Sequence, residues 1–218
     1  MSQAKSNLLN ACQHGNVNKI RQLLHNNMFS HDVYYQAADM CIRAKQSQAF
    51  HLIVSTPHVL THPKWSWDGL GTTAIDYESF EILEFCVAQA SQKQREHLYN
   101  FSIIMDKVNG FQIIDQFVDD NIRSSFAEKL DRSTEPYIVR RLFPFTTDCV
   151  GAFMRIFWGG RIDLCVELVQ MRPQLKTWLK EQSNGQYLHD RAQEILNQVQ
   201  RAEISAQMPE NAVKLRKM

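Results

Sequence analysis

The chain contains one glycine-centred phrase twice, 145 residues apart. Residues 15–24 read GNVNKIRQLL and residues 160–169 read GRIDLCVELV, with apolar side chains at matching places after the glycine. Adding 30, 62 or 94 to the residue numbers of the first copy finds three weaker copies between them. Self-similarity at a period of about 20–50 residues is typical of proteins built from stacked repeats. This repeat constrains the fold more than any other feature of the chain.

Each copy has the apolar spacing of two short antiparallel helices. In the first copy the apolar residues before the glycine are Leu8, Ala11 and Cys12, and those after it are Ile20, Leu23 and Leu24. Residues at positions i, i+3 and i+4 lie on one face of a helix. One such pair cannot bury its own apolar face, so several pairs must stack. The sequence therefore predicts an all-α solenoid of about five to six irregular helix pairs.

The turn inside each pair requires a residue that accepts a positive φ at the end of the first helix. Glycine adopts this conformation freely and asparagine does so passably. The predicted hinge residues are Gly15, Lys45, Tyr77, Asn109 and Gly160. Three of these fit the requirement, whereas Lys45 and Tyr77 indicate either strained hinges or a different register.

The run from Leu8 to Leu24 resembles the helical part of an ankyrin repeat, and the run from Phe153 to Val169 is similar to the same part. The resemblance covers roughly residues 5–172 and implies helix pairs that repeat at about 33 residues and present a surface to a partner protein. The Thr-Pro-Leu-His opening of the family's first helix is missing, which puts its regular β-hairpin fingers in doubt. We therefore expect a degenerate ankyrin-like array, with another helical-hairpin solenoid as the alternative.

The predicted domain organisation has three parts. Residues 1–172 form the array, in which residues 119–147 fill the long last interval as a compressed sixth pair with a helix start at Pro136. Residues 173–206 form a C-terminal helical cap, because a terminal repeat needs one polar face. An interaction or dimerisation helix is the alternative for that segment. Residues 207–218 are predicted to be a disordered tail.

Composition and charge exclude several classes of function. The 24 basic and 23 acidic side chains give a formal net charge of +1. Without a long run of like charge, nucleic acid is not an expected partner. The chain shows no stretch of about 18 apolar residues and no apolar core of a signal peptide, so neither membrane insertion nor cleaved export is expected. Five cysteines without a CxxC motif indicate a reducing, cytoplasmic compartment.

Residues 56–73 interrupt the repeats and contain the predicted partner-binding residues Trp65, Trp67 and Asp68. Two prolines and the dipeptide at 68–69 predict an extended segment with a hairpin-type turn. Tryptophans two residues apart would then point the same way and could anchor a partner. The alternative is that the indoles fold down and cover the edge of the array. Replacement by alanine distinguishes the two, since it reduces stability strongly only in the second case.

Catalytic and metal-binding motifs are weak in this chain. It has no P-loop, GxSxG or HExxH motif, and no cofactor or metal is expected. The spacing of His58 and His62 suits zinc only on a helix, so a structural or solvated pair is favoured. Cys149 lies outside the apolar stripes and is the candidate nucleophile of an alternative function, a small cysteine-dependent enzyme that uses His97 or His189 as a base.

The main functional prediction is a protein-protein interaction module. Its expected binding surface is the concave face of the array or the segment 56–73. Degenerate ankyrin-like arrays occur in eukaryotic proteins, in giant viruses and in effectors of intracellular bacteria. An effector that acts inside a host cell is therefore one expected setting.

Overall fold

The computed structural model describes residues 3–60, 62, 65–183 and 189–215. All regular secondary structure in these residues is helical, which confirms the predicted all-α class. None of the helices described is both long and apolar enough to cross a lipid bilayer. The chain divides into two compact units, Met1–Val118 and Asp119–Met218.

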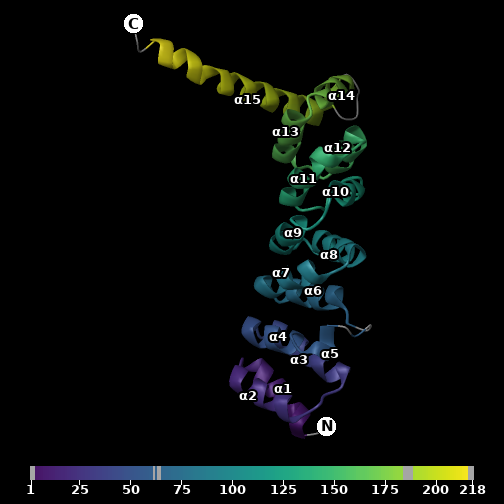
Figure 1. Ribbon diagram of the computed structural model, residues 1–218. Helices are drawn as coiled ribbons and strands as arrows, with labels where there is room; N and C mark the ends of the chain where they lie inside the picture. The colour runs from purple at the N-terminus through teal and green to yellow at the C-terminus, as the bar shows by residue number, and fades with distance from the viewer. Residues whose placement is uncertain (1–2, 61, 63–64, 184–188, 216–218) are drawn as a thin grey trace. The chain divides into compact units, whose positions relative to one another are not determined.

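The first unit consists of four helix pairs and one short extra helix. Its helices are α1 (Gln3–Gln13), α2 (Val17–Asn26), α3 (His31–Arg43), α4 (Ser47–Val54), α5 (Pro57–Leu60), α6 (Trp67–Asp76), α7 (Phe80–Gln89), α8 (Gln92–Ile104) and α9 (Val108–Asp115). The first helices of the pairs, α1, α3, α6 and α8, contact one another in chain order. The second helices, α2, α4, α7 and α9, do the same (Figure 1). We call these two rows the first-helix layer and the second-helix layer.

Five hinges share one backbone conformation. The positive φ values are 62° at Gly15, 55° at Lys45, 55° at Glu78, 51° at Asp106 and 76° at Gly160. The residue after each of these has a ψ between 68° and 78°. In the first hinge the next amide, that of Asn16, donates to the carbonyl of Ala11 at 2.9 Å and closes the helix end. The same bond recurs from Gln46 to Cys41 at 2.8 Å.

Two predicted hinge positions are wrong. The left-handed residues are Glu78 in place of Tyr77 and Asp106 in place of Asn109, so successive hinges lie 30, 33, 28 and 54 residues apart. The prediction assumed nearly even spacing and favoured asparagine for its tolerance of positive φ. Asn109 instead lies inside α9. Helix packing sets the position of these two hinges. The buried side chains of α6 and α8 must face their neighbours, and this decides which residue occupies the hinge, whether or not that residue favours a positive φ.

The second unit also consists of helix pairs. Its elements are α10 (Asp120–Ala127), α11 (Pro136–Leu142), the 3-10 helix η1 (Phe143–Phe145), α12 (Cys149–Phe157), α13 (Ile162–Met171), α14 (Gln174–Ser183) and α15 (His189–Leu215). The helices α10 and α11 contact each other, and α11 begins at Pro136 as predicted. The first part of α15 buries Ala192, Ile195 and Val199, and the helix contacts α13 and α14. The side chains of the predicted tail, residues 207–218, lie outside the described part of the chain.

Candidate partner-binding surface

The segment predicted to be extended contains the start of a helix. Ser66 is the N-cap of α6, and its Oγ accepts a hydrogen bond from the amide of Gly69 at 3.1 Å. Asp68 lies in the first turn, where the helix dipole stabilises a carboxylate. The hairpin-type turn predicted at Asp68 and Gly69 is therefore wrong, because Ser66 supplies a helix cap directly before them.

Trp65 and Trp67 are buried, with exposed fractions of 7% and 8%. Their ring centroids lie 5.6 Å apart in an edge-to-face arrangement. Trp65 also packs edge-on against Tyr35 at 5.4 Å, and Trp67 against Phe85 at 5.8 Å. The two indoles therefore connect α6 to α3 and α7. This geometry corresponds to structural cover and differs from a projecting loop.

Asp68 is the centre of a hydrogen-bonded group that joins α6 to α8. Its Oδ1 accepts bonds from the Oγ of Ser66 at 2.6 Å and from the Nε2 of Gln94 at 3.3 Å. The Nδ1 of His97 lies 3.0 Å from its Oδ2. Burial acts to raise the pKa of Asp68, but the hydrogen bonds from Ser66, His97 and Gln94 outweigh it and hold that pKa below its ordinary value. We call these four residues the Asp68 cluster.

A surface cavity of about 370 Å³ adjoins the Asp68 cluster. It is lined by His31, Asp32, Tyr35, Gln36 and Ser66. Ser66 belongs to both the cavity and the cluster, so the two form one continuous polar area on the first-helix layer. Burial is the main cause that raises the pKa of Tyr35, and the nearby carboxylates add to it. The phenol is therefore neutral at physiological pH, and its hydroxyl is hydrogen-bonded to Ser66.

The outer faces of α3 and α6 are negatively charged. The two helices carry four aspartates, namely Asp32, Asp39, Asp68 and Asp76. Their only Lys or Arg is Arg43, whose Nε donates to Asp39 at 2.7 Å. Arg43 compensates Asp39 and His97 contacts Asp68, so an incoming positively charged group would meet mainly the carboxylates of Asp32 and Asp76.

His62, one member of the histidine pair predicted with His58, lies beside this surface. The rings of His31 and His62 are stacked with centroids 3.7 Å apart. The side chain of His58 lies outside the described part of the chain. Among the described residues, no group of three or more His, Cys, Asp or Glu side chains is placed to hold a metal ion.

Cys149 begins α12 and is buried. The Nε2 of Gln174 lies 3.2 Å from its Sγ, and an amide group cannot serve as a general base. The Nδ1 of His189 contacts the carbonyl oxygen of Ser183, and His97 belongs to the Asp68 cluster of the other unit. On α11, Arg140 forms an ion pair with Glu167 of α13, with the Nη2 of Arg140 3.0 Å from the Oε1 of Glu167.

Sequence reasoning named Asp68, and named His97 only as a possible base for Cys149, but it missed that Tyr35, Gln94 and His97 lie around Asp68. Tyr35, Gln94 and His97 come from helices that are distant in sequence, and no local motif connects them. The available signal was a polar stripe at helical spacing along α3, from Asp32 through Gln36 to Asp39.

Comparison of the chain with protein-family models, with curated proteins and with solved structures gives no match.

Proposed function

We propose that the chain is a protein-binding module, a solenoid of ankyrin-like helix pairs whose first-helix layer holds a partner protein. One observation carries the proposal. The Asp68 cluster and the adjoining cavity form a continuous polar area from three successive pairs, through α3, α6 and α8. A bound segment would contact several pairs at once, which is how stacked repeats use their extended surfaces.

The repeated hinge geometry supports the ankyrin-like part of the proposal. Five hinges combine a left-handed residue with the same following backbone conformation, and one of them is in the second unit. Each hinge reverses the chain after a first helix of similar length. A common backbone with variable residues is expected of repeats that have diverged in sequence.

Trp65 and Trp67 have an indirect role in this proposal. Their rings lie beneath the start of α6, next to Ser66 and Asp68, and fix the position of that helix start. The buried indoles support the binding surface, and Asp68 is the member of the predicted trio that can contact a partner.

The proposed setting is the reducing interior of a host cell. All five cysteines are free and buried, as expected for a protein that does not depend on disulfides. A eukaryotic cell lysate is therefore the source in which we would seek the partner.

The test compares two charge reversals of equal size on opposite layers. Asp32→Lys changes the cavity on α3, whereas Glu84→Lys changes an exposed position of α7 in the second-helix layer. Thermal unfolding first establishes that both variants are folded. We expect a lysate protein that is captured by the native chain and by Glu84→Lys, and whose capture falls about tenfold with Asp32→Lys. Equal capture by the native chain and Asp32→Lys would contradict the proposed surface.

A further inference from the structure

The cavity beside the Asp68 cluster contains an exposed carboxylate that is not paired with Lys or Arg. We call it the α3 cavity; it measures about 370 Å³ and is lined by His31, Asp32, Tyr35, Gln36 and Ser66. Asp32 is exposed and forms no ion pair with any residue that the structure describes. Neither Lys nor Arg is among the five lining residues. A positively charged group that enters the cavity would therefore gain an ion pair without displacing one.

The wall of the α3 cavity combines this carboxylate with an aromatic ring and an amide. Asp32, Tyr35 and Gln36 are spaced i, i+3 and i+4 along α3, so their side chains lie on one face of the helix. The side-chain oxygen of Gln36 accepts hydrogen bonds, and the face of the Tyr35 ring attracts cations. The planar guanidinium of arginine suits all three groups, because it carries five N–H donors and stacks on aromatic rings. The ammonium of lysine is a compact point charge and suits mainly the carboxylate.

The Tyr35 ring is held in place by the start of α6. Its hydroxyl is hydrogen-bonded to Ser66 and lies so close to Gly69 that a Cβ there would be 2.5 Å from the phenol oxygen. Trp65 packs edge-on against the ring, with centroids 5.4 Å apart. A wall that is fixed before binding loses little conformational entropy when a ligand packs on it.

The same helix shows how an arginine satisfies a carboxylate and a phenol. Asp39 accepts a hydrogen bond from the Nε of Arg43 at 2.7 Å. The guanidinium carbon of Arg43 lies 4.9 Å from the centre of the Tyr77 ring, and its Nη1 donates to the Tyr77 hydroxyl at 2.5 Å. Asp32 lies seven residues before Asp39, which places both on the same side of α3. Asp32 and Tyr35 thus repeat the carboxylate and the phenol of this group, with an open cavity beside them.

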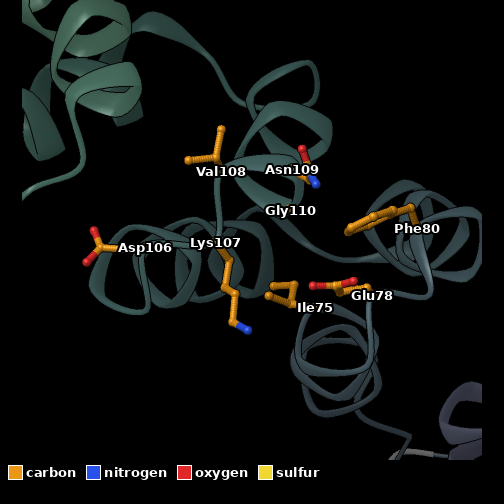
Figure 2. A pocket seen from close by; sticks show the side chains of 8 residues that line it. All are labelled: Ile75, Glu78, Phe80, Asp106, Lys107, Val108, Asn109 and Gly110. Atoms are coloured by element: carbon orange, nitrogen blue, oxygen red, sulfur yellow. The ribbon is translucent and has the colours of Figure 1, made fainter.

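A second cavity of the first unit contains its own base. It measures about 230 Å³ and lies between the third and fourth hinges. Its lining includes Glu78 and Asp106 together with Lys107 (Figure 2). Because Lys107 offsets part of that negative charge, the α3 cavity is the better site for a cation.

We propose that the α3 cavity binds an arginine side chain of the partner protein. The guanidinium pairs with Asp32, donates to the side-chain oxygen of Gln36 and stacks over the Tyr35 ring. The inference rests on the proposed function, which supplies the partner protein, and it names the side chain that the partner inserts.

The experiment titrates the full chain with Nα-acetyl-arginine methylamide and follows the binding by heteronuclear NMR. The informative signals are the backbone amides of residues 31–36 and the indole of Trp65, whose ring packs against His31 and Tyr35. Trp65→Phe identifies the indole signal. We expect these signals to move to saturation with a dissociation constant of about 1–10 mM, as suits a single side chain. The citrulline derivative, which has the same shape without the charge, should bind at least about tenfold more weakly, and the lysine derivative about threefold more weakly.

Two matched variants each remove one exposed carboxylate from the first-helix layer. Asp32→Asn should weaken binding of the arginine derivative at least about fivefold, whereas Asp76→Asn should leave it within about twofold. Tyr35→Phe retains the ring and should bind normally, while Tyr35→Leu should weaken binding at least about threefold. Thermal unfolding first establishes that each variant is folded, and the two asparagine variants decide the question if Tyr35→Leu does not fold.

Three results overturn the inference. They are an equal loss of affinity with Asp32→Asn and Asp76→Asn, an equal affinity for the citrulline derivative, and the absence of a saturable change up to about 100 mM.

The inference and the proposed function can fail separately. A lysate protein whose capture falls with Asp32→Lys, together with an arginine derivative that does not bind in the α3 cavity, would support the proposed function and overturn the arginine. Binding of the derivative in the α3 cavity, together with lysate capture that is unchanged by Asp32→Lys, would support the arginine site and contradict the proposed function.

Discussion

The hydroxyl of Tyr99 donates a hydrogen bond of 2.7 Å to the Oδ1 of Asp115 and joins the two helices of the fourth pair inside the core. Both residues are buried, with exposed fractions of 0% for Tyr99 and 5% for Asp115. Tyr99→Phe should reduce the free energy of unfolding by about 1–3 kcal/mol, because a buried carboxylate loses a hydrogen bond. Urea unfolding measures this, with Tyr77→Phe as the exposed control, for which we expect a change within about 0.5 kcal/mol. Similar losses in both variants would contradict the assignment.

Replacement of the buried tryptophans should destabilise the protein. Trp65→Ala and Trp67→Ala each remove a ring that is packed between α6 and its neighbours, and each should cost about 3–5 kcal/mol. Thermal unfolding is the measurement, with the half-exposed Trp158→Ala in the second unit as a control. If the double variant retained native stability and lost only partner capture, the tryptophans would be anchors and their burial would be wrong.

Glycine should stabilise the second hinge. Lys45 has a φ of 55°, a conformation that costs an L-residue roughly 1–2 kcal/mol. Lys45→Gly should therefore raise the free energy of unfolding by about 0.5–1 kcal/mol, after the greater chain entropy of glycine is subtracted. Ala44→Gly is the matched control, because Ala44 has a φ of −92° and gains nothing from glycine. A loss of stability with Lys45→Gly in urea unfolding would exclude a left-handed residue there.

Acid should weaken the second unit through Asp131. Burial acts to raise the pKa of Asp131, but hydrogen bonds from Ser133 and Thr134 hold it below the ordinary value of 3.8. A carboxyl whose folded pKa is depressed contributes stability above its unfolded pKa and loses it as the pH falls through the folded pKa. The difference in stability between the native chain and Asp131→Asn should thus be largest near neutral pH and shrink below about pH 4.

Urea unfolding at several pH values follows this difference. Gln170→Asn, at an exposed position of α13 without an ionisable group, serves as the control, and its effect on stability should not depend on pH. A difference for Asp131→Asn that stays constant down to about pH 2 would contradict the hydrogen-bonded carboxylate.

The five thiols should react slowly in the folded protein. Burial raises the pKa of Cys165 to about 12, although Arg191 acts to lower it, and burial also raises the pKa of Cys86. Alkylation by iodoacetamide near neutral pH should modify all five only after unfolding in urea, since the thiolate is the reactive form. Fast and selective labelling of Cys149 would instead favour the alternative of a cysteine-dependent enzyme.

The apolar spacing of the sequence predicted the core well. Leu8, Cys12 and Ile20 in the first copy, and Phe153 and Ile156 in the fifth, are all fully buried. Spacing succeeds here because a helix places residues i, i+3 and i+4 on one face regardless of the neighbouring pair.

Hinges and surface contacts were harder to predict. Glu78 and Asp106 adopt positive φ because the packing of α6 and α8 requires it, and residue preference alone does not show this. The segment around Asp68 was predicted as a turn because the dipeptide at 68–69 is a common turn signal, and the prediction did not consider Ser66 as a helix cap. Gln94 and His97, two of the partners of Asp68, come from α8, so their contact with Asp68 depends on the stacking of the pairs.

The shared hinge conformation separates two kinds of change that the protein can accept. Each helix pair of the first unit includes its own hinge between the two helices. The segments that connect one pair to the next differ in length, and they are residues 27–30, 55–66 and 90–91. The longest of these carries α5 and leads directly into Ser66 and Asp68. Variation in connection length therefore alters which polar groups stand beside one another on neighbouring pairs while the pairs keep their own structure. Under the proposed function, a change in connection length would alter which partner the first-helix layer binds without any new core.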